Sequence, residues 1–263
     1  MQKGVKKAME TTTYRIMQYN ILHDGDGWGW ENLATPRLPA SERAAMVSDI
    51  ISEHTPDILV LCERFEEWRD FCPSGYSFFA PAVGGVNLKE TAKPEQKSTV
   101  NRNPIYFKSD RFCLLEGGIE RLEGFDVDGT DFRHSYNKRV VTWGVLEDYD
   151  ISQKILVFAT HWQTDSEKRA IHARITTELV KRISARYGDA LPVIVTADFN
   201  ERATAPNFIN MLGELKLTNC VPEANSVDQI AVRGATPTAS GMDICEATRY
   251  ASDHKPIWCD IVI

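Results

Sequence analysis

Residues 192–200 read PVIVTADFN, an apolar run followed at once by two polar residues, Asp198 and Asn200. A short continuous apolar run is typical of a strand that is buried on both faces. Residues 57–63 (DILVLCE) and 155–161 (ILVFATH) repeat the pattern and end in Glu63 and His161. Because ligand and catalytic groups gather at strand ends, these stretches indicate both the fold class and where a site should lie.

Further strands are predicted where β-forming residues cluster, over Tyr14–Leu22, Ile105–Phe107, Val140–Leu146 and Ile257–Ile263. Segments with helical spacing lie between strands in both halves of the chain. This order predicts an α/β (α+β) architecture in which helices cover a pair of packed sheets.

Two helices are predicted. The first covers residues 41–54, with Ser41 as its N-cap and Pro56 ending it. The second covers residues 166–187, where Ile171, Ile175, Leu179 and Ile183 recur every four residues and Gly188 is a natural stop.

Composition narrows the class of protein. The chain has 263 residues, 43% hydrophobic and 25% charged, which are ordinary values for a globular protein.

We expect a flexible tail over residues 1–12, one domain over residues 13–263, and a monomer. No apolar run approaches the ~20 residues of a membrane span. Residues 1–13 lack the apolar core of a signal peptide, which favours a cytoplasmic protein, although a secreted protein with its signal removed would look the same.

The charge balance bears on the partner. Thirty basic residues stand against 37 acidic ones, giving a net charge of −7, and no lysine or arginine run is present. This lowers the expectation for duplex nucleic acid, although a local basic groove is still open. The six cysteines form no CxxC pair, so no zinc motif is predicted.

The strand-end residues share one chemistry. The polar residues at or near apolar runs are Asn20, Glu63, His161, Asp198, Asn200, Asp228, Asp253 and His254. Two carboxylates ~5 Å apart repel by roughly 3 kcal/mol at an effective dielectric of ~20. A hard cation such as Mg²⁺ or Mn²⁺ relieves that repulsion. The set therefore predicts metal-assisted attack of water on a phosphorus centre, provided that Glu63 lies within ~10 Å of Asp198 and His254.

In this order the set resembles the endonuclease/exonuclease/phosphatase family, and the similarity runs from about Tyr14 to Ile263. Stretches such as PDILVLCE, VIVTADFNE and the Ser252-Asp253-His254 triplet carry it. The resemblance implies a four-layer sandwich of two mixed sheets flanked by helices. It also implies a metal-dependent hydrolase that cleaves a phosphodiester in a nucleic acid, a lipid headgroup or a small molecule.

The resemblance also implies roles for individual residues. Asn20, Glu63 and Asp253 would hold the metal, and Asp198 would position or deprotonate the attacking water. Asn200 and His161 would bind the scissile phosphate. His254, oriented by Asp228, would stabilise the transition state.

The chain departs from the family pattern at two positions that carry no chemistry, Cys62 before the metal glutamate and Ala197 before the Asp-Phe-Asn triplet. Cys62 could alter hydrogen bonding behind the metal site. Tyr106 is expected in the core. Arg169 is equally suited to a structural ion pair and to a phosphate contact, and we include it among the substrate-binding residues. Arg43 is expected on a solvated face or in an ion pair.

Some features allow more than one interpretation. Trp28, with Trp30, could stack on substrate at the cleft mouth or anchor a loop. Residues 126–130 (DVDGT) resemble a phosphatase nucleophile motif, but no apolar strand precedes them. The alternative function is a non-catalytic binding or scaffold protein built on the same fold.

Overall fold

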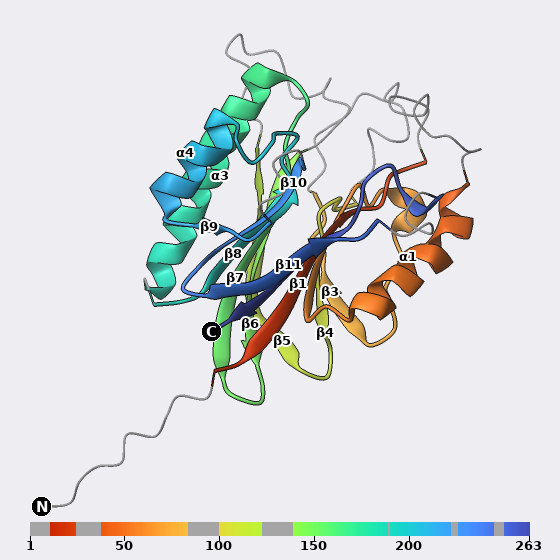
Figure 1. Ribbon diagram of the computed structural model, residues 1–263, viewed down its shortest axis with the longest axis horizontal. Coiled ribbons are helices and arrows are strands. Elements are labelled where there is room, and N and C mark those ends of the chain that lie inside the picture. Colours follow the sequence, from red (N-terminus) through yellow and green to blue (C-terminus); the bar gives the residue numbers. More distant parts are fainter. Residues whose placement is uncertain are drawn as a thin grey trace, which may run out of the picture.

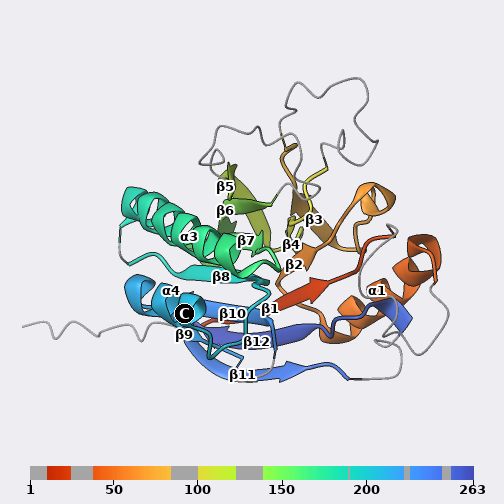
Figure 2. The same cartoon turned by 90° about the horizontal axis from the view of Figure 1, so that it is seen from above.

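In the computed structural model the chain is described over residues 11–24, 38–83, 100–122, 139–188, 190–221, 226–244 and 250–263. Within these ranges the strands form two six-stranded sheets that pack face to face. Helix α1 (Ala40–His54) covers the first sheet, and α3 (Ser166–Tyr187) and α4 (Pro206–Leu215) cover the second (Figures 1 and 2). The α/β sandwich predicted from the sequence is confirmed.

Each sheet is mixed, with one parallel pair among the described strands. The first has the order β11-β12-β1-β2-β4-β3 and is parallel at β1/β2. The second has the order β5-β6-β7-β8-β10-β9 and is parallel at β7/β8. The strands of the first sheet are β1 (Thr13–Asn20), β2 (Ile58–Cys62), β3 (Tyr76–Phe79), β4 (Ile105–Lys108), β11 (Thr236–Met242) and β12 (Ile257–Val262). Those of the second are β5 (Phe112–Arg121), β6 (Val140–Asp148), β7 (Gln153–His161), β8 (Val193–Asp198), β9 (Thr218–Asn219) and β10 (Asp228–Arg233).

The layering explains the continuous apolar runs. Every residue of β2 and β8 is buried, because each sheet has the other sheet on one face and a helix layer on the other. Ile58, Val157 and Ile194 meet between the sheets. Burying each such side chain contributes about 1.5–3 kcal/mol, so the central strands form a stable platform for their ends.

Two details of the predicted helices are wrong. Helix α1 begins at Ala40 after Pro39, and no side-chain hydrogen bond caps it, so Ser41 is not the N-cap. In α3, Ile171 is 41% exposed although Leu179 and Ile183 are buried. A four-residue repeat advances about 40° around the helix per step, so Ile171 rotates off the buried face. Gly188 does end α3, with a left-handed φ of +85°.

Of the two alternatives predicted for Arg43, the ion pair is confirmed, with Asp24, and the solvated face is wrong. Its side chain is 2% exposed, and it donates to the carbonyls of Ile21, Leu22 and Ala251 and to the carboxylate of Asp24. This arginine therefore joins α1 to the segment that follows β1. None of the helices in the described part of the chain is long and apolar enough to cross a membrane.

Candidate active site

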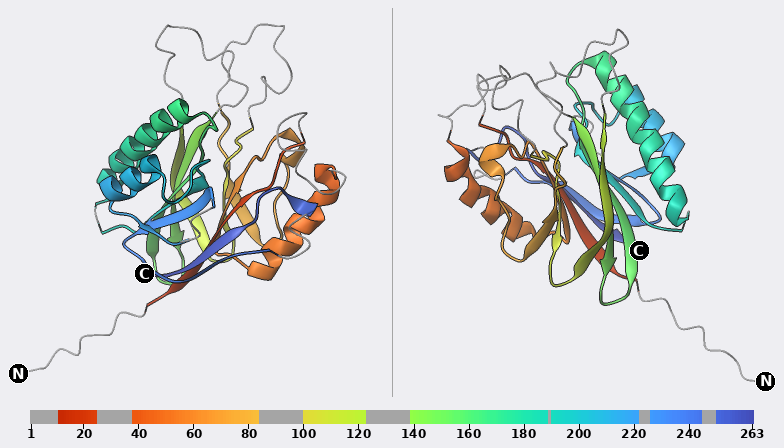
Figure 3. Two further views of the ribbon diagram at one scale, coloured as in Figure 1. Left: turned by 45° about the horizontal axis from the view of Figure 1, so that its top comes forward. Right: turned by 180° about the vertical axis from the view of Figure 1, so that it is seen from behind.

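The two parallel strand pairs end at the same edge of the sandwich (Figure 3). In the first sheet Asn20 at the end of β1 is the neighbour of Cys62 at the end of β2. In the second sheet His161 at the end of β7 is paired with Asp198 at the end of β8. Asp198 is in turn paired with Asp228, the first residue of the antiparallel strand β10. The register thus sets the polar residues of each sheet side by side, and the packing of the two sheets brings Asn20 to Asp198.

Asp198 lies at the centre of this group and is 1% exposed. Its Oδ2 accepts a hydrogen bond of 3.0 Å from Nδ2 of Asn20 and lies 3.2 Å from Nε2 of His161. Nε2 of His254 lies 3.7 Å from the same oxygen. The other oxygen, Oδ1, accepts from the backbone N–H of Asn200 at 2.9 Å. Three residues that lie far from Asp198 in the sequence, Asn20, His161 and His254, thus converge on its carboxylate.

Asp228 lies behind His254. Its Oδ2 is 2.7 Å from Nδ1 of His254, and its Oδ1 accepts from the side-chain amide of Gln18 on β1. Burial lowers the pKa of His254, but the charges of Asp228 and Asp198 outweigh it and raise that pKa well above its usual value. His254 is therefore an imidazolium at neutral pH, held in place by a carboxylate that Gln18 orients.

Glu63 lies on the other side of Asn20. Its Oε1 accepts from Nδ2 of Asn20 at 3.2 Å, and its Oε2 lies 2.6 Å from Nδ1 of His23. Burial raises the pKa of Glu63, but the hydrogen bond from His23 and the charge of Arg139 act against it, and the pKa lies well below its usual value. Because Nδ2 of Asn20 contacts both Glu63 and Asp198, the two carboxylates lie well within the ~10 Å that a shared site requires.

Two residues that follow strands at the site have left-handed backbone conformations. Glu63 has a φ of +62° and Asn200 a φ of +50°. Left-handed conformations are uncommon outside glycine, and for glutamate they cost energy that the surrounding structure must supply. Both residues occur where an apolar strand ends at the site.

The site suits a hard divalent cation. Glu63, Asp198 and Asp253 offer carboxylate oxygens, the ligands that Mg²⁺ and Mn²⁺ prefer. Burial and the charge of Glu63 raise the pKa of Asp253, so these two carboxylates repel each other. A bound cation would relieve that repulsion, and the residues present therefore fit one.

Asn20 is arranged differently from the metal ligand that the resemblance implies. Its Oδ1 accepts from the backbone N–H of Leu22 at 3.1 Å, and its Nδ2 faces Glu63 and Asp198. In this arrangement Asn20 is a donor that bridges the two carboxylates. Its oxygen would have to turn toward them before it could ligate a cation.

A second grouping of possible ligand atoms is formed by Asp198, Asp228 and His254, which lie within 4.8 Å of one another. Both oxygens of Asp228 already have partners, Gln18 and His254. The raised pKa of His254 favours the protonated ring, which has no free nitrogen for a metal. These contacts make Glu63 the better candidate ligand for a cation, and they favour an imidazolium beside Asp228.

Asp198 and His161, the other two titratable residues at the centre of the site, differ in charge. Burial, with the charge of Asp228, raises the pKa of Asp198 to about 6. Burial also lowers the pKa of His161, and Arg139 adds to that effect, so His161 is neutral. A carboxylate that titrates near neutrality is suited to accept a proton from water.

Other residues singled out in the sequence lie behind or beside the site. Cys62 is buried, with its Sγ 3.3 Å from the carbonyl oxygen of Thr160. Ala197 lies in β8 and has no positive φ, so the absence of glycine costs nothing there. Tyr106 is in the core, as expected. Arg169 contacts Glu201 at 3.1 Å. Trp28 and Trp30 lie outside the described residues.

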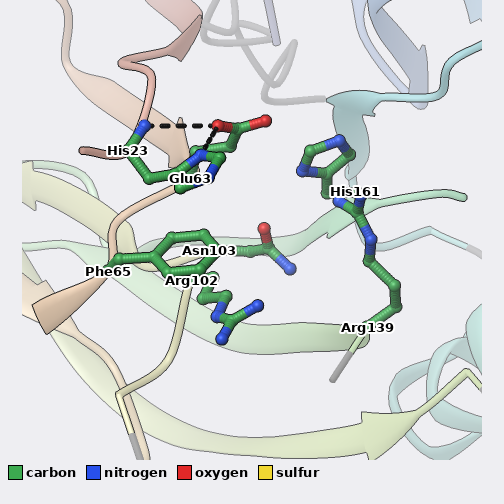
Figure 4. Close-up of a pocket in the computed structure, with 7 residues that line it drawn as sticks. All are labelled: His23, Glu63, Phe65, Arg102, Asn103, Arg139 and His161. Atoms are coloured by element: carbon green, nitrogen blue, oxygen red, sulfur yellow. Dashed lines mark hydrogen bonds and ion pairs between the residues drawn. The ribbon is translucent and has the colours of Figure 1, made fainter. Parts of the chain in front are cut away.

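A pocket opens from Glu63 and His161 (Figure 4). It is lined by His23, Glu63, Phe65, Arg102, Asn103, Arg139 and His161. Five residues at or near the site were not predicted from the sequence: His23, Gln18, Arg102, Asn103 and Arg139. The only available signal was position: His23 follows Asn20 by three residues, Asn103 precedes β4, and Arg139 immediately precedes β6.

Comparisons with known proteins agree with this geometry. No protein-family model matches the sequence. Nocturnin from Xenopus laevis is 22% identical over 215 residues, which are 77% of this chain and 51% of that protein. The chain thus spans about half the length of this curated relative.

Solved structures match over nearly the whole chain. An endonuclease/exonuclease/phosphatase family protein from Bacteroides thetaiotaomicron has a TM-score of 0.73 and 18% identity, covering 97% of this chain and 96% of that one. A mannosyl-6-phosphatase from the same organism has a TM-score of 0.70 and 17% identity, covering 95% and 100%. The chain therefore has the fold of the endonuclease/exonuclease/phosphatase proteins, and the resemblance seen in the sequence is confirmed at the level of the fold.

Proposed function

We propose that this protein is a phosphoester hydrolase that depends on Mg²⁺ or Mn²⁺ and cleaves a phosphodiester by attack of water. The observation that carries the proposal is the convergence on Asp198 of Asn20, His161 and His254, with Asp228 behind His254. The fold shared with the endonuclease/exonuclease/phosphatase proteins supports it.

Asp198 is the proposed base. Asn20 and the backbone of Asn200 orient its carboxylate, and its pKa of about 6 leaves it mainly ionised at neutral pH. A base whose pKa lies near the working pH combines the correct protonation state with enough driving force for proton transfer. Asp198 would take the proton of the attacking water.

His254, His161 and Asn200 would hold the phosphoryl group. His254 supplies a positive charge that Asp228 maintains as negative charge develops on the phosphoryl oxygens. One N–H of the Asn200 side chain donates to the carbonyl of Trp162 at 2.8 Å, which fixes the amide and leaves its second N–H for a phosphoryl oxygen.

Glu63, Asp253 and Asn20 would hold the cation, once the Asn20 oxygen turns toward it. A bound divalent cation supplies Lewis-acid stabilisation of the phosphoryl oxygens and of the departing oxygen. His23 keeps Glu63 oriented, the kind of support that metal-binding carboxylates require.

The test measures release of p-nitrophenolate from bis-p-nitrophenyl phosphate, a diester, and from p-nitrophenyl phosphate, a monoester. The monoester is included because one structural neighbour is named as a mannosyl-6-phosphatase. We expect activity that EDTA removes and Mg²⁺ or Mn²⁺ restores. Glu63→Gln and His254→Ala should each lower kcat/KM about 100-fold or more.

The control is Glu178→Gln on the exposed face of α3, where Glu178 pairs with Arg174. Activity that neither site variant changes would refute the assigned roles. Absence of hydrolysis together with no measurable Mg²⁺ or Mn²⁺ binding by calorimetry would favour the non-catalytic scaffold.

A further inference from the structure

The pocket beside Glu63 and His161 contains two arginines although the chain as a whole carries a net charge of −7. Arg102 is 7% exposed, and its guanidinium lies over the Phe65 ring, 3.6 Å from the centroid. Figure 4 shows the Arg139 side chain reaching toward His161, with Arg102 on the opposite side of Asn103. Both arginines belong to the lining of the same pocket.

The charges that line this pocket favour an anion. Glu63 supplies one negative charge, the two arginines supply two positive charges, and His161 is neutral. Burial lowers the pKa of Arg102 to about 10, and the positive charge of Arg139 adds to that effect. Arg102 is buried and Arg139 is half-buried, and Glu63, Glu66 and Glu67 act on Arg102 against the effect of Arg139. An anionic ligand beside both arginines would lower their mutual repulsion, and planar guanidinium groups match phosphate oxygens.

Asn103 adds an independent observation. It is 1% exposed, and its Oδ1 is buried without a hydrogen-bond partner. Its Nδ2 donates to the carbonyl of Val140 at 3.1 Å, and its backbone N–H donates to Oδ1 of Asn101. The amide orientation is thereby fixed, and the unpaired oxygen needs a donor such as a hydroxyl group.

The position of the pocket indicates which part of a substrate it would receive. Its lining includes Glu63 and His161 but not Asp198, Asn200 or His254. It therefore begins at the proposed reaction centre and extends away from the groups that act on the scissile bond. A ligand here is a neighbouring part of the substrate.

We propose that Arg102, Asn103 and Arg139 form a specificity pocket that binds a second phosphate group of the substrate, carried on a hydroxyl-bearing unit such as a sugar. The arginines bind the phosphate, and Oδ1 of Asn103 accepts a hydrogen bond from a hydroxyl of the carrier. The inference rests on the proposed function for its connection to catalysis. The binding itself requires neither hydrolysis nor a metal.

Calorimetry in EDTA tests the pocket without catalysis, using three probes: inorganic phosphate, ribose 5-phosphate and ribose. We expect ribose 5-phosphate to bind more tightly than phosphate, and ribose to show no measurable binding. Arg102→Gln and Arg139→Gln should each weaken binding of both phosphate probes at least about tenfold. The matched control is Arg174→Gln, an arginine exposed on α3, which should change neither.

One further variant tests the hydroxyl contact. Asn103→Leu should remove the advantage of ribose 5-phosphate over inorganic phosphate and leave phosphate binding in place. Phosphate binding that neither Arg102→Gln nor Arg139→Gln weakens would overturn the proposal. Equal binding of ribose and ribose 5-phosphate, or no phosphate binding at all, would overturn it as well.

If the protein binds these probes as expected but hydrolyses no phosphoester, the pocket stands and the proposed function fails. If it hydrolyses a diester while the arginine variants bind phosphate normally, the proposed function stands and the pocket fails.

Discussion

Substituting Asp228 by asparagine tests the charge arrangement around His254 with little change in shape. The amide would keep the volume of the side chain but could not accept from both Gln18 and His254, which contact the two carboxylate oxygens now. The negative charge that raises the pKa of His254 would be lost. Asp198, 3.7 Å from Nε2, would supply the remaining stabilisation.

The magnitude follows from the contact. Opposite unit charges whose centres are about 4 Å apart attract by about 4 kcal/mol at an effective dielectric of 20. Since 1.36 kcal/mol corresponds to a factor of ten in rate, full loss of this term would lower kcat/KM by nearly 1000-fold. Because Asp198 still faces the ring, we expect a loss of about 100- to 1000-fold in Asp228→Asn.

The pH profile gives a second readout. His254 must be protonated to stabilise the phosphoryl oxygens, so activity falls as the pH rises through its raised pKa. Asp228→Asn lowers that pKa, and the alkaline limb of the profile should therefore move to lower pH. A variant that only disturbed folding would lower activity without moving this limb.

The assay is hydrolysis of bis-p-nitrophenyl phosphate with Mg²⁺ across the pH range, together with urea unfolding to verify stability. The matched control is Asp243→Asn, which breaks a His–Asp pair with Nε2 of His54 at 3.1 Å. A kcat/KM for Asp228→Asn within threefold of that control, with an unmoved alkaline limb, would refute the reasoning.

Three more outcomes are expected. Arg43→Gln should lower the free energy of unfolding by about 3 kcal/mol, because backbone carbonyls would lose a buried donor. Urea unfolding measures this change. A decrease no larger than that of Arg174→Gln, at an exposed arginine, would contradict it. His172 is buried, and burial lowers its pKa to about 3. Its effect on the free energy of unfolding is fully favourable above pH 6.5, the ordinary pKa of histidine, and is lost as the pH falls from 6.5 toward 3. The loss is at most about 1.4 kcal/mol per pH unit, because only the unfolded chain binds the proton in this range. His172→Asn should therefore have a flatter pH dependence of unfolding in EDTA, and an unchanged slope would argue against this account. Glu63→Gln should weaken Mn²⁺ binding about 10-fold or more in calorimetry, whereas Glu178→Gln should not.

The predicted elements were accurate where local patterns decide them. The runs predicted over residues 57–62 and 192–197 correspond to the buried strands β2 (Ile58–Cys62) and β8 (Val193–Asp198), and residues 166–187 form one helix ending at Gly188. The polar residues at their ends could be proposed as a site because parallel strands end at one edge of a sheet. Ser41 and Ile171 were misjudged because cap geometry and helix rotation depend on neighbouring packing.

The residues that support the site could not be found in the same way. Gln18 contacts Asp228 across 210 positions of sequence, and His23 contacts Glu63 across 40. Arg43 resembles any helical surface arginine in the sequence, yet it is buried and donates to four backbone carbonyls. No local pattern distinguishes such residues from ordinary polar ones.

The sequence by itself determined the buried central strands, two of the helices and the polar side chains that follow the strands, because hydrophobic periodicity and stop signals act over a few residues. Helix α4 and the strands β3, β5 and β11 were not predicted from it. Only the tertiary structure decided the register that sets His161 beside Asp198, the left-handed turn at Glu63, and the grouping of Arg102, Asn103 and Arg139 in one pocket. These features depend on the packing of the two sheets, and the energy of each contact exists only when distant parts of the chain have already met.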